Sequence, residues 1–373
     1  GSHFNTASYQ LVSATTACDS SLAYGSMPQS DAQEFTGDGL YKICVKLSDQ
    51  AGNPDAFGSS VSFEFKITPP LFSSLALANE ATDGFINSTE KTHALALAET
   101  LTATNYDHAQ YKLVPSSTTC DANLSYGSMP NANSTDFGND GAYIICTELT
   151  DNAGNPANYG SSPPITLKTN APQFQSLPLA GDASNGYINA SERLLSNALA
   201  GPLAASLYNT AKYKLVPSST SCNGSLVYDN ALPTNNTQDF GADGTYKICV
   251  QLSDTAANNA IYGASPDFEL KVTPPSFTNL PLAGDATDTY INAAEKLLAH
   301  PLADSLSAIA YNTATYKLIA DGDACDNSLQ FGSMPNGNTA DFGLDGDYRV
   351  CVRLVDFAGN PPAYGTSDII HLK

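Results

Sequence analysis

The chain has 373 residues, enough for two to four domains of ordinary size. Its 37 acidic residues outnumber 16 basic ones and give a net charge of -21, which argues against nucleic acid or an anionic membrane as a partner. Hydrophobic residues make up 42% of the chain, yet no apolar run approaches the ~18 residues of a membrane span, so we expect folded cores and no membrane insertion.

Three short phrases recur four times along the chain and define its organisation. They follow Gly1-Ser2-His3, which has the form of a tag remnant. Their period of about 102 residues suits an independently folding domain and is too long for a solenoid unit. The phrases are Tyr-Lys/Gln-Leu-Val/Ile at Tyr9, Tyr111, Tyr213 and Tyr316, Gly-x-Tyr-x-x-Cys ending at Cys44, Cys146, Cys249 and Cys351, and Asp-x-Ala-Gly/Ala-Asn at Asp49, Asp151, Asp254 and Asp356.

The period predicts domain boundaries at the linkers that contain proline. We expect a tag remnant at 1–3 and four repeats at 4–69, 70–171, 172–274 and 275–373. The linkers at 68–70, 170–172 and 273–275 favour extended, semi-rigid connections and hence a rod-like array. Repeats 2 to 4 carry about 34 residues before their tyrosine phrase that repeat 1 lacks. The sandwich of repeat 1 is therefore expected to expose an edge that invites pairing with another chain.

Within each repeat, short β-prone runs alternate with turn clusters. In repeat 2 the runs at 110–114, 124–126, 142–149 and 165–168 are predicted strands, separated by residues rich in Pro, Gly, Asn and Asp. Several short strands at this spacing indicate an all-β fold of tandem immunoglobulin-like sandwiches, with at most one short helix in each repeat.

Two cysteines occur in every repeat at nearly constant separation, which predicts one disulfide inside each repeat. A loop of about 27 residues closed in this way should stabilise a repeat by on the order of 3 kcal/mol. No Cys-x-x-Cys is present, so zinc and thioredoxin-like chemistry lack their spacing. Disulfides imply an oxidising compartment. The predicted pairs are Cys18–Cys44, Cys120–Cys146, Cys222–Cys249 and Cys325–Cys351.

The strongest candidate site is an acidic loop near the start of each complete repeat, at residues 80–90, 182–192 and 285–295. Oxygen-bearing side chains recur there at offsets 0, 3, 7 and 10, as calcium coordination requires. The Asn and Glu at the last two offsets also match a helix capping box, and Leu-Leu follows them in repeats 3 and 4. A capping box at these two residues is compatible with a calcium ion bound by the same loop. The candidate ligands are Glu80, Asp83, Asn87 and Glu90 in repeat 2, Asp182, Asn185, Asn189 and Glu192 in repeat 3, and Asp285, Asp288, Asn292 and Glu295 in repeat 4.

Two other acidic motifs are predicted to be turns. The Asp-x-Ala-Gly-Asn phrase combines residues that accept left-handed backbone, so it should connect the last two strands, with its Asp as a further candidate for a calcium site between repeats. The Asp/Asn-x-Gly phrase before each second cysteine is predicted to be a tight turn with no further role. It occurs at Asp38, Asp140, Asp243 and Asp345.

Nothing in the sequence indicates an active site. His93, His108, His300 and His371 do not recur between repeats and have no repeated nucleophile beside them. Trp is absent, and the recurring tyrosines suit core or corner positions better than sugar stacking. We therefore expect no enzyme.

The phrases Asp-Gly-x-Tyr-x-x-Cys-Val-x-Leu-x-Asp-x-Ala-Gly-Asn and Gly-Tyr-Ile-Asn-Ala-x-Glu resemble those of bacterial immunoglobulin-like repeats from large surface adhesins. The resemblance covers the whole chain after the tag remnant. It implies extender repeats, often stiffened by calcium between domains, with ligand binding in distal domains. A disulfide in every repeat departs from that pattern, because calcium-stiffened extenders commonly lack cysteine.

We therefore expect a structural extender or stalk segment of a secreted or cell-surface bacterial adhesin. Its partner would be a host or neighbouring-cell surface ligand, protein or glycan, bound by this chain or by other domains. The alternative is a ligand-binding array that uses the variable loops between the cysteines, at 29–34, 131–136, 234–239 and 336–341.

Overall fold

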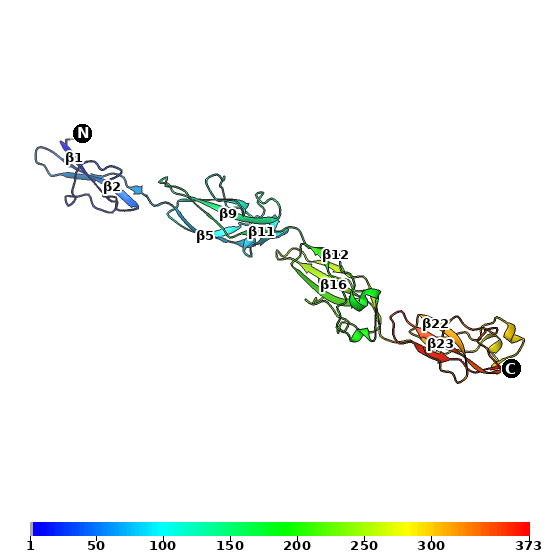
Figure 1. Ribbon diagram of the computed structural model, residues 1–373. Helices are drawn as coiled ribbons and strands as arrows, with labels where there is room; N and C mark the ends of the chain where they lie inside the picture. Colours follow the sequence, from blue (N-terminus) through cyan, green and yellow to red (C-terminus); the bar gives the residue numbers. More distant parts are fainter. Residues whose placement is uncertain (1–2) are drawn as a thin grey trace. The chain divides into compact units, whose positions relative to one another are not determined.

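The computed structural model describes residues 3–373; Gly1 and Ser2, part of the predicted tag remnant, lie outside the described residues. The chain separates into two compact units, Gly1–Asn170 and Ala171–Lys373, which hold repeats 1 and 2 and repeats 3 and 4 respectively. Every repeat has its own sheet, and strands dominate throughout (Figure 1). In the described part of the chain, no helix is long and apolar enough to cross a membrane.

The three complete repeats share one order of elements. Each consists of two short strands of a small sheet, a short strand between two 3₁₀ turns, and four strands of a larger sheet. Repeat 2 contains β5 (Leu71–Leu77), η1 (Asn79–Ala81), β6 (Phe85–Ile86), η2 (Glu90–Thr92), β7 (Ala98–Thr104), β8 (His108–Pro115), β9 (Gly141–Thr150), β10 (Asn158–Ser161) and β11 (Ile165–Leu167).

Repeats 3 and 4 repeat this order almost unchanged. Repeat 3 contains β12 (Gln173–Ser176), η3 (Gly181–Asn185), β13 (Tyr187–Asn189), η4 (Glu192–Leu194), β14 (Ala204–Ser206), β15 (Thr210–Pro217), β16 (Gly244–Ser253), β17 (Ile261–Ala264) and β18 (Phe268–Lys271). Repeat 4 contains β19 (Ser276–Asn279), η5 (Gly284–Ala286), β20 (Tyr290–Ile291), η6 (Glu295–Leu297), β21 (Ser307–Ile309), β22 (Thr313–Ala320), β23 (Gly346–Val355), β24 (Ala363–Thr366) and β25 (Ile370–Leu372).

The long strand that carries the second cysteine organises each sheet. In repeat 2, β9 pairs antiparallel with β8 on one side and with β10 and β11 on the other. β6 then adds to β11 in parallel, and β5 and β7 form the separate two-stranded sheet. Because side chains alternate along a strand, Tyr143, Ile145 and Leu149 enter the core from one face of β9, while Cys146 lies on the other.

All four predicted disulfides are present. They join Cys18 to Cys44, Cys120 to Cys146, Cys222 to Cys249 and Cys325 to Cys351. The second cysteine of each pair is fully buried, so each bond ties the loop between the cysteines onto the outer face of the central strand.

Repeat 1 has only the larger sheet. It contains β1 (Thr6–Ser13), β2 (Gly39–Ser48), β3 (Ala56–Ser59) and β4 (Phe63–Phe65), with β2 in the centre. In the described part of repeat 1, nothing corresponds to β5, β6 and β7. Each complete repeat has a cluster of buried apolar side chains, but repeat 1 contributes to none of these clusters. Apart from β2, β4 pairs with no strand among the described residues, so it presents an edge, as expected.

The all-β immunoglobulin-like fold is confirmed, with one predicted strand wrong. Residues 124–126 form no strand, because Asp121 holds the chain in a turn: its Oδ1 accepts the Asn123 N–H at 2.9 Å and its carbonyl accepts the Tyr126 hydroxyl at 3.0 Å. In place of the single short helix expected, each complete repeat has two 3₁₀ turns of three to five residues, the second of them at the capping box. The Asp-x-Ala-Gly-Asn phrase connects β9 to β10, a strand not predicted, and not to β11, which is the strand predicted at 165–168.

Candidate functional site

The second half of each acidic loop forms a capping box. In repeat 4, Asn292 Oδ1 accepts the N–H groups of Ala294 at 2.9 Å and Glu295 at 3.2 Å, while Glu295 Oε2 accepts the Asn292 N–H at 2.9 Å. Such reciprocal bonds satisfy donors that a helical turn leaves free. Repeats 2 and 3 repeat this geometry with the pairs Asn87/Glu90 and Asn189/Glu192.

The residues at the first two offsets of each acidic loop bond groups other than the capping box. Asp285 Oδ2 lies 2.9 Å from His300 Nδ1, Asp182 Oδ2 accepts from Asn235 Nδ2 at 2.6 Å, and Glu80 pairs with His93 at 2.6 Å. The residues at offset 3 close their own turns, and their Oδ1 atoms accept a backbone N–H two residues on at 2.8–3.0 Å; they are Asp83, Asn185 and Asp288.

At each of the four positions in repeat 4, a side-chain oxygen already lies within hydrogen-bond distance of a protein partner. Across residues 3–373, the structure contains no group of three His, Cys, Asp or Glu side chains that could hold a metal ion. Calcium needs six to eight oxygens around one centre, so an ion at this loop would have to displace these protein partners. Calcium at these loops stays a prediction.

A recurring contact site lies at the junction between repeats 3 and 4. Asn360, from the Asp-x-Ala-Gly-Asn turn, donates from Nδ2 to the Lys271 carbonyl at 2.7 Å and accepts the Ala190 N–H at 3.0 Å. Asn189 donates in turn to the Ala358 carbonyl at 2.9 Å, across the same junction. Both Asn side chains are buried, so these bonds are shielded from water.

The equivalent positions meet at the junction between repeats 1 and 2. Asn155 Nδ2 donates to the Lys66 carbonyl at 3.0 Å, and the Lys66 ammonium lies 3.0 Å from Asp107 Oδ2. The Asn152 N–H and then Lys66 lower the pKa of Asp107, and Asp107 raises the pKa of Lys66. The ammonium at the later junction bonds Asn312, the counterpart of Asp107, at 3.0 Å.

One acidic residue at the exits of repeats 1, 2 and 3 has a role that was not predicted from the sequence. Asp38 accepts the N–H groups of Ile67 at 2.8 Å and Thr68 at 3.3 Å, so it holds the chain where it leaves repeat 1. These bonds, that from Ile67 first, lower the Asp38 pKa. Asp140 and Asp243 hold the corresponding segments in repeats 2 and 3. The sequence does contain a signal for this role, because an Asp recurs 29 or 30 residues before the exit residues that it bonds.

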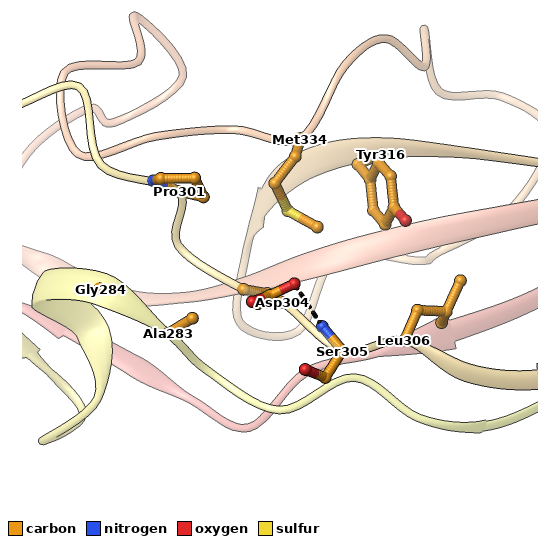
Figure 2. Close-up of a pocket in the computed structure, with 9 residues that line it drawn as sticks. Ala283, Gly284, Pro301, Asp304, Ser305, Leu306, Tyr316 and Met334 are labelled. Carbon is orange, nitrogen blue, oxygen red and sulfur yellow. Dashed lines mark hydrogen bonds between the residues drawn. The ribbon is translucent and has the colours of Figure 1, made fainter.

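Grooves lie beside the tyrosine phrase in three repeats. Those of about 400 Å³ in repeat 1 and about 220 Å³ in repeat 3 are lined partly by the variable loops, through residues such as Glu34 and Asp239. The cavity of about 450 Å³ in repeat 4 lies between Tyr316 and Met334 on one side and the segment with Asp304 on the other (Figure 2). The loop 336–341 does not contribute to this cavity.

The variable loops are tied to the sheet at their last residue. Asp239 Oδ1 lies 2.6 Å from the Lys214 ammonium, and this hydrogen bond raises the pKa of Lys214. Asp136 pairs with Lys112 at 2.7 Å in the same way. In repeats 2 and 3, the loop positions before this last residue are free to vary without loss of the ion pair.

These features define a class of protein, a tandem array of disulfide-linked immunoglobulin-like sandwiches with hydrogen-bonded junctions. No family model and no curated protein sequence matches the chain. Its fold is similar to a Ca²⁺-stabilized adhesin of an Antarctic bacterium that binds ice (20% identity, 98% of this chain and 90% of that chain, TM-score 0.34). It is also similar to a 1.5-MDa bacterial ice-binding adhesin (18% identity, 82% of this chain and 99% of that chain, TM-score 0.39). A third similar structure is protocadherin gammaB7 (12% identity, 100% of this chain and 94% of that chain, TM-score 0.31).

Proposed function

We propose that this chain is an extender segment of a bacterial surface adhesin, which carries binding domains away from the cell. One observation carries the proposal: an Asn that recurs in all four repeats joins its repeat to the preceding one at two junctions. The Asn of the Asp-x-Ala-Gly-Asn turn bonds the carbonyl of the preceding repeat's last strand region in both units, at Lys66 and at Lys271. A ligand-binding surface would instead place its recurring residues in exposed grooves.

The chemistry of the chain supports a location outside the cell. Four disulfides with buried second cysteines belong to an oxidising compartment. A net charge of -21 keeps such a segment solvated and disfavours adhesion to anionic surfaces along its length. Under this proposal the surface ligand, protein or glycan, is bound by other domains, and the chain itself performs no reaction.

The proposal is tested by placing the chain between a cell-surface anchor and a small domain of known ligand. We expect attachment of cells to a ligand-coated surface to fall when residues 171–373 are removed. Replacing that unit with a flexible Gly/Ser linker of equal residue number should not restore attachment fully. Attachment that is independent of the number of repeats would refute the extender function.

A ligand-binding array is the second candidate, because the variable loops line grooves in repeats 1 and 3. The isolated chain would then bind glycans or host cells without any added domain. Substitution of Asp31 or Thr237, which line these grooves, should reduce that binding while leaving melting temperatures unchanged. A glycan array probed with the unmodified chain separates the two functions directly.

A further inference from the structure

The cavity of about 450 Å³ in repeat 4 combines apolar side chains with one carboxylate. Tyr316 and Met334 lie on one side of it and Asp304 on the other, and Leu306 also lines it (Figure 2). A cavity of this volume is large enough for a small organic molecule. All of its lining residues belong to repeat 4, so a ligand bound there would be independent of the extender role.

The Asp304 carboxylate is held by its own turn and has no positive partner. Its Oδ1 accepts the Ser305 N–H at 2.7 Å. His300 and Lys317, the basic side chains next to lining residues in the sequence, each pair with a different acid. Among residues 3–373, no lysine, arginine or histidine forms an ion pair with Asp304.

The other complete repeats lack this free carboxylate. In repeat 2 the position of Asp304 is occupied by Glu99, whose Oε1 accepts a hydrogen bond from Asn79 Nδ2 at 3.1 Å. The counterpart of Asn79 in repeat 4 is Gly284, which has no side-chain donor and lines the cavity. Repeat 3 has Gly201 in place of the acid. A carboxylate that faces a cavity without a donor from the protein is therefore particular to repeat 4.

The backbone beside Asp304 is also particular to repeat 4. Ser305 has a φ of 53°, whereas its counterparts Thr100 and Pro202 do not have a positive φ. A residue other than glycine in this left-handed region costs free energy, and such residues cluster at ligand-binding sites. The turn that carries Asp304 is thus one that packing alone did not require in repeats 2 and 3.

Asp304 acts electrostatically on the aromatic side of the cavity. Burial first, and then Tyr311 and Asp304, raise the pKa of Tyr316. The negative charge of Asp304 is therefore felt at the Tyr316 hydroxyl, on the other side of the cavity (Figure 2).

The charge of Asp304 decides which ligand suits the cavity. An occupant would displace water from the carboxylate, which costs free energy unless a positive group or hydrogen-bond donors take its place. An ammonium group supplies both the charge and the N–H donors. The ring of Tyr316 and the thioether of Met334 offer a surface for an apolar or aromatic body.

We infer that this cavity binds a small organic ammonium ion. Its N–H groups would donate to the Asp304 carboxylate, and its apolar body would pack against Tyr316 and Met334. A neutral sugar suits the cavity less well, because its buried hydroxyls each need a partner. Among the lining residues, polar side chains come from Asp304, Ser305 and Tyr316 alone.

The test uses the full chain, isotopically labelled at its methionine methyl groups, and phenethylammonium as the probe. The chain has three methionines, of which Met334 lines the cavity, while Met27 and Met129 hold the same position in repeats 1 and 2. We expect the NMR signal of the Met334 methyl group to shift saturably, with a dissociation constant on the order of 1 mM. The signals of Met27 and Met129 should not shift, so they serve as internal controls.

Two comparisons test the role of the carboxylate. Phenethyl alcohol, which has the shape of the probe without its charge, should bind about tenfold more weakly or worse to the unmodified chain. Phenethylammonium should lose affinity to the same extent with Asp304→Asn. This variant keeps an oxygen for the Ser305 N–H, so its melting temperature should be unchanged. Asp323→Asn is the matched control, since it removes an exposed carboxylate of repeat 4 that does not line the cavity.

Three results would overturn the inference. The first is the absence of a saturable shift at Met334, or equal shifts at all three methionines. The second is equal affinity for the alcohol and the ammonium ion, because the carboxylate would then not select the ligand. The third is an equal loss of affinity in Asp323→Asn and Asp304→Asn, which would assign the binding to the overall charge of the chain.

Discussion

The side-chain nitrogen of Asn360 in repeat 4 bonds the main-chain oxygen of Lys271 in repeat 3 at 2.7 Å. The same side chain accepts the N–H of Ala190 and is only 4% exposed. One amide therefore connects the turn of one repeat to two segments of its neighbour. Since Asp356 holds the Asn360 N–H and Nδ2 at 3.0 and 2.8 Å, the amide is already oriented within its own repeat.

Replacing Asn360 with Ala should loosen this junction. The change leaves the Lys271 carbonyl and the Ala190 N–H without their partner, at about 1–3 kcal/mol for each buried group left unsatisfied. We expect faster amide hydrogen exchange at Ala190 and a lower melting temperature. Asn53→Ala is the matched control: it alters the same turn in repeat 1, where Asn53 bonds Asp49. Equal effects of the two substitutions would assign the loss to the turn and not to the junction.

The bonds from Asp38 to the exit of repeat 1 should depend on pH. Hydrogen bonds from Ile67 and then Thr68 lower the Asp38 pKa below its ordinary value of 3.8. The folded-state pKa is depressed, so this stabilisation is complete above the ordinary value and is lost as the pH falls through the folded pKa. We expect the amide NMR shifts of Ile67 and Thr68 to titrate with a midpoint below 3.8.

Asp38→Asn should abolish that titration, because the amide carries no charge. It keeps one acceptor oxygen, so repeat 1 should remain folded and only the exit segment should become more mobile. A titration that persists in Asp38→Asn would show that another group controls the two amide shifts. The hydrogen bonds to Asp38 would then not account for the pH dependence of the exit segment.

The features predicted from the sequence are those with local causes. The capping box, such as that of Asn292 and Glu295, needs only residues three apart. The disulfides were predictable because Cys146 sits in an alternating strand and Cys120 lies at fixed separation from it. The long strand β9 was predictable from its run of β-prone residues between two turn clusters.

Features that depend on distant residues were not predicted. The parallel pairing of Phe85 with Thr166 joins positions 81 residues apart, and a two-residue strand has no periodicity to detect. β10 contains Gly160, which disfavours a strand unless the ring of Phe72 covers it. The role of Asp140 escaped notice because a turn explained it adequately, whereas its acceptor bonds reach Thr169.

Calcium should have little effect on the thermal stability of this chain. Side-chain oxygens of Asn189 and Glu192 already accept backbone N–H groups, and Asp182 already accepts a hydrogen bond from Asn235. We expect melting temperatures in millimolar calcium and in EDTA to agree within about 2 °C, a difference that corresponds to less than 1 kcal/mol in a domain of this size. Magnesium at equal concentration controls for ionic strength. A rise of several degrees with calcium alone, removed by Asp182→Asn, would instead establish the predicted ion at the acidic loop.

The same substitution should have opposite consequences at Gly160 and Gly58. In Gly160→Val the new side chain collides with the Phe72 ring, which lies 2.1 Å from a Cβ, and overpacking of this kind costs about 1–3 kcal/mol. In Gly58→Val the space is open, and valine suits a strand better than glycine, so stability should be unchanged or slightly raised. Urea unfolding followed by hydrogen exchange in each repeat measures both effects. A double variant, Gly160→Val with Phe72→Ala, should recover part of the loss, since it removes the collision. If Gly58→Val destabilised repeat 1 as much as Gly160→Val destabilises repeat 2, the space beside Gly58 would have to be filled already.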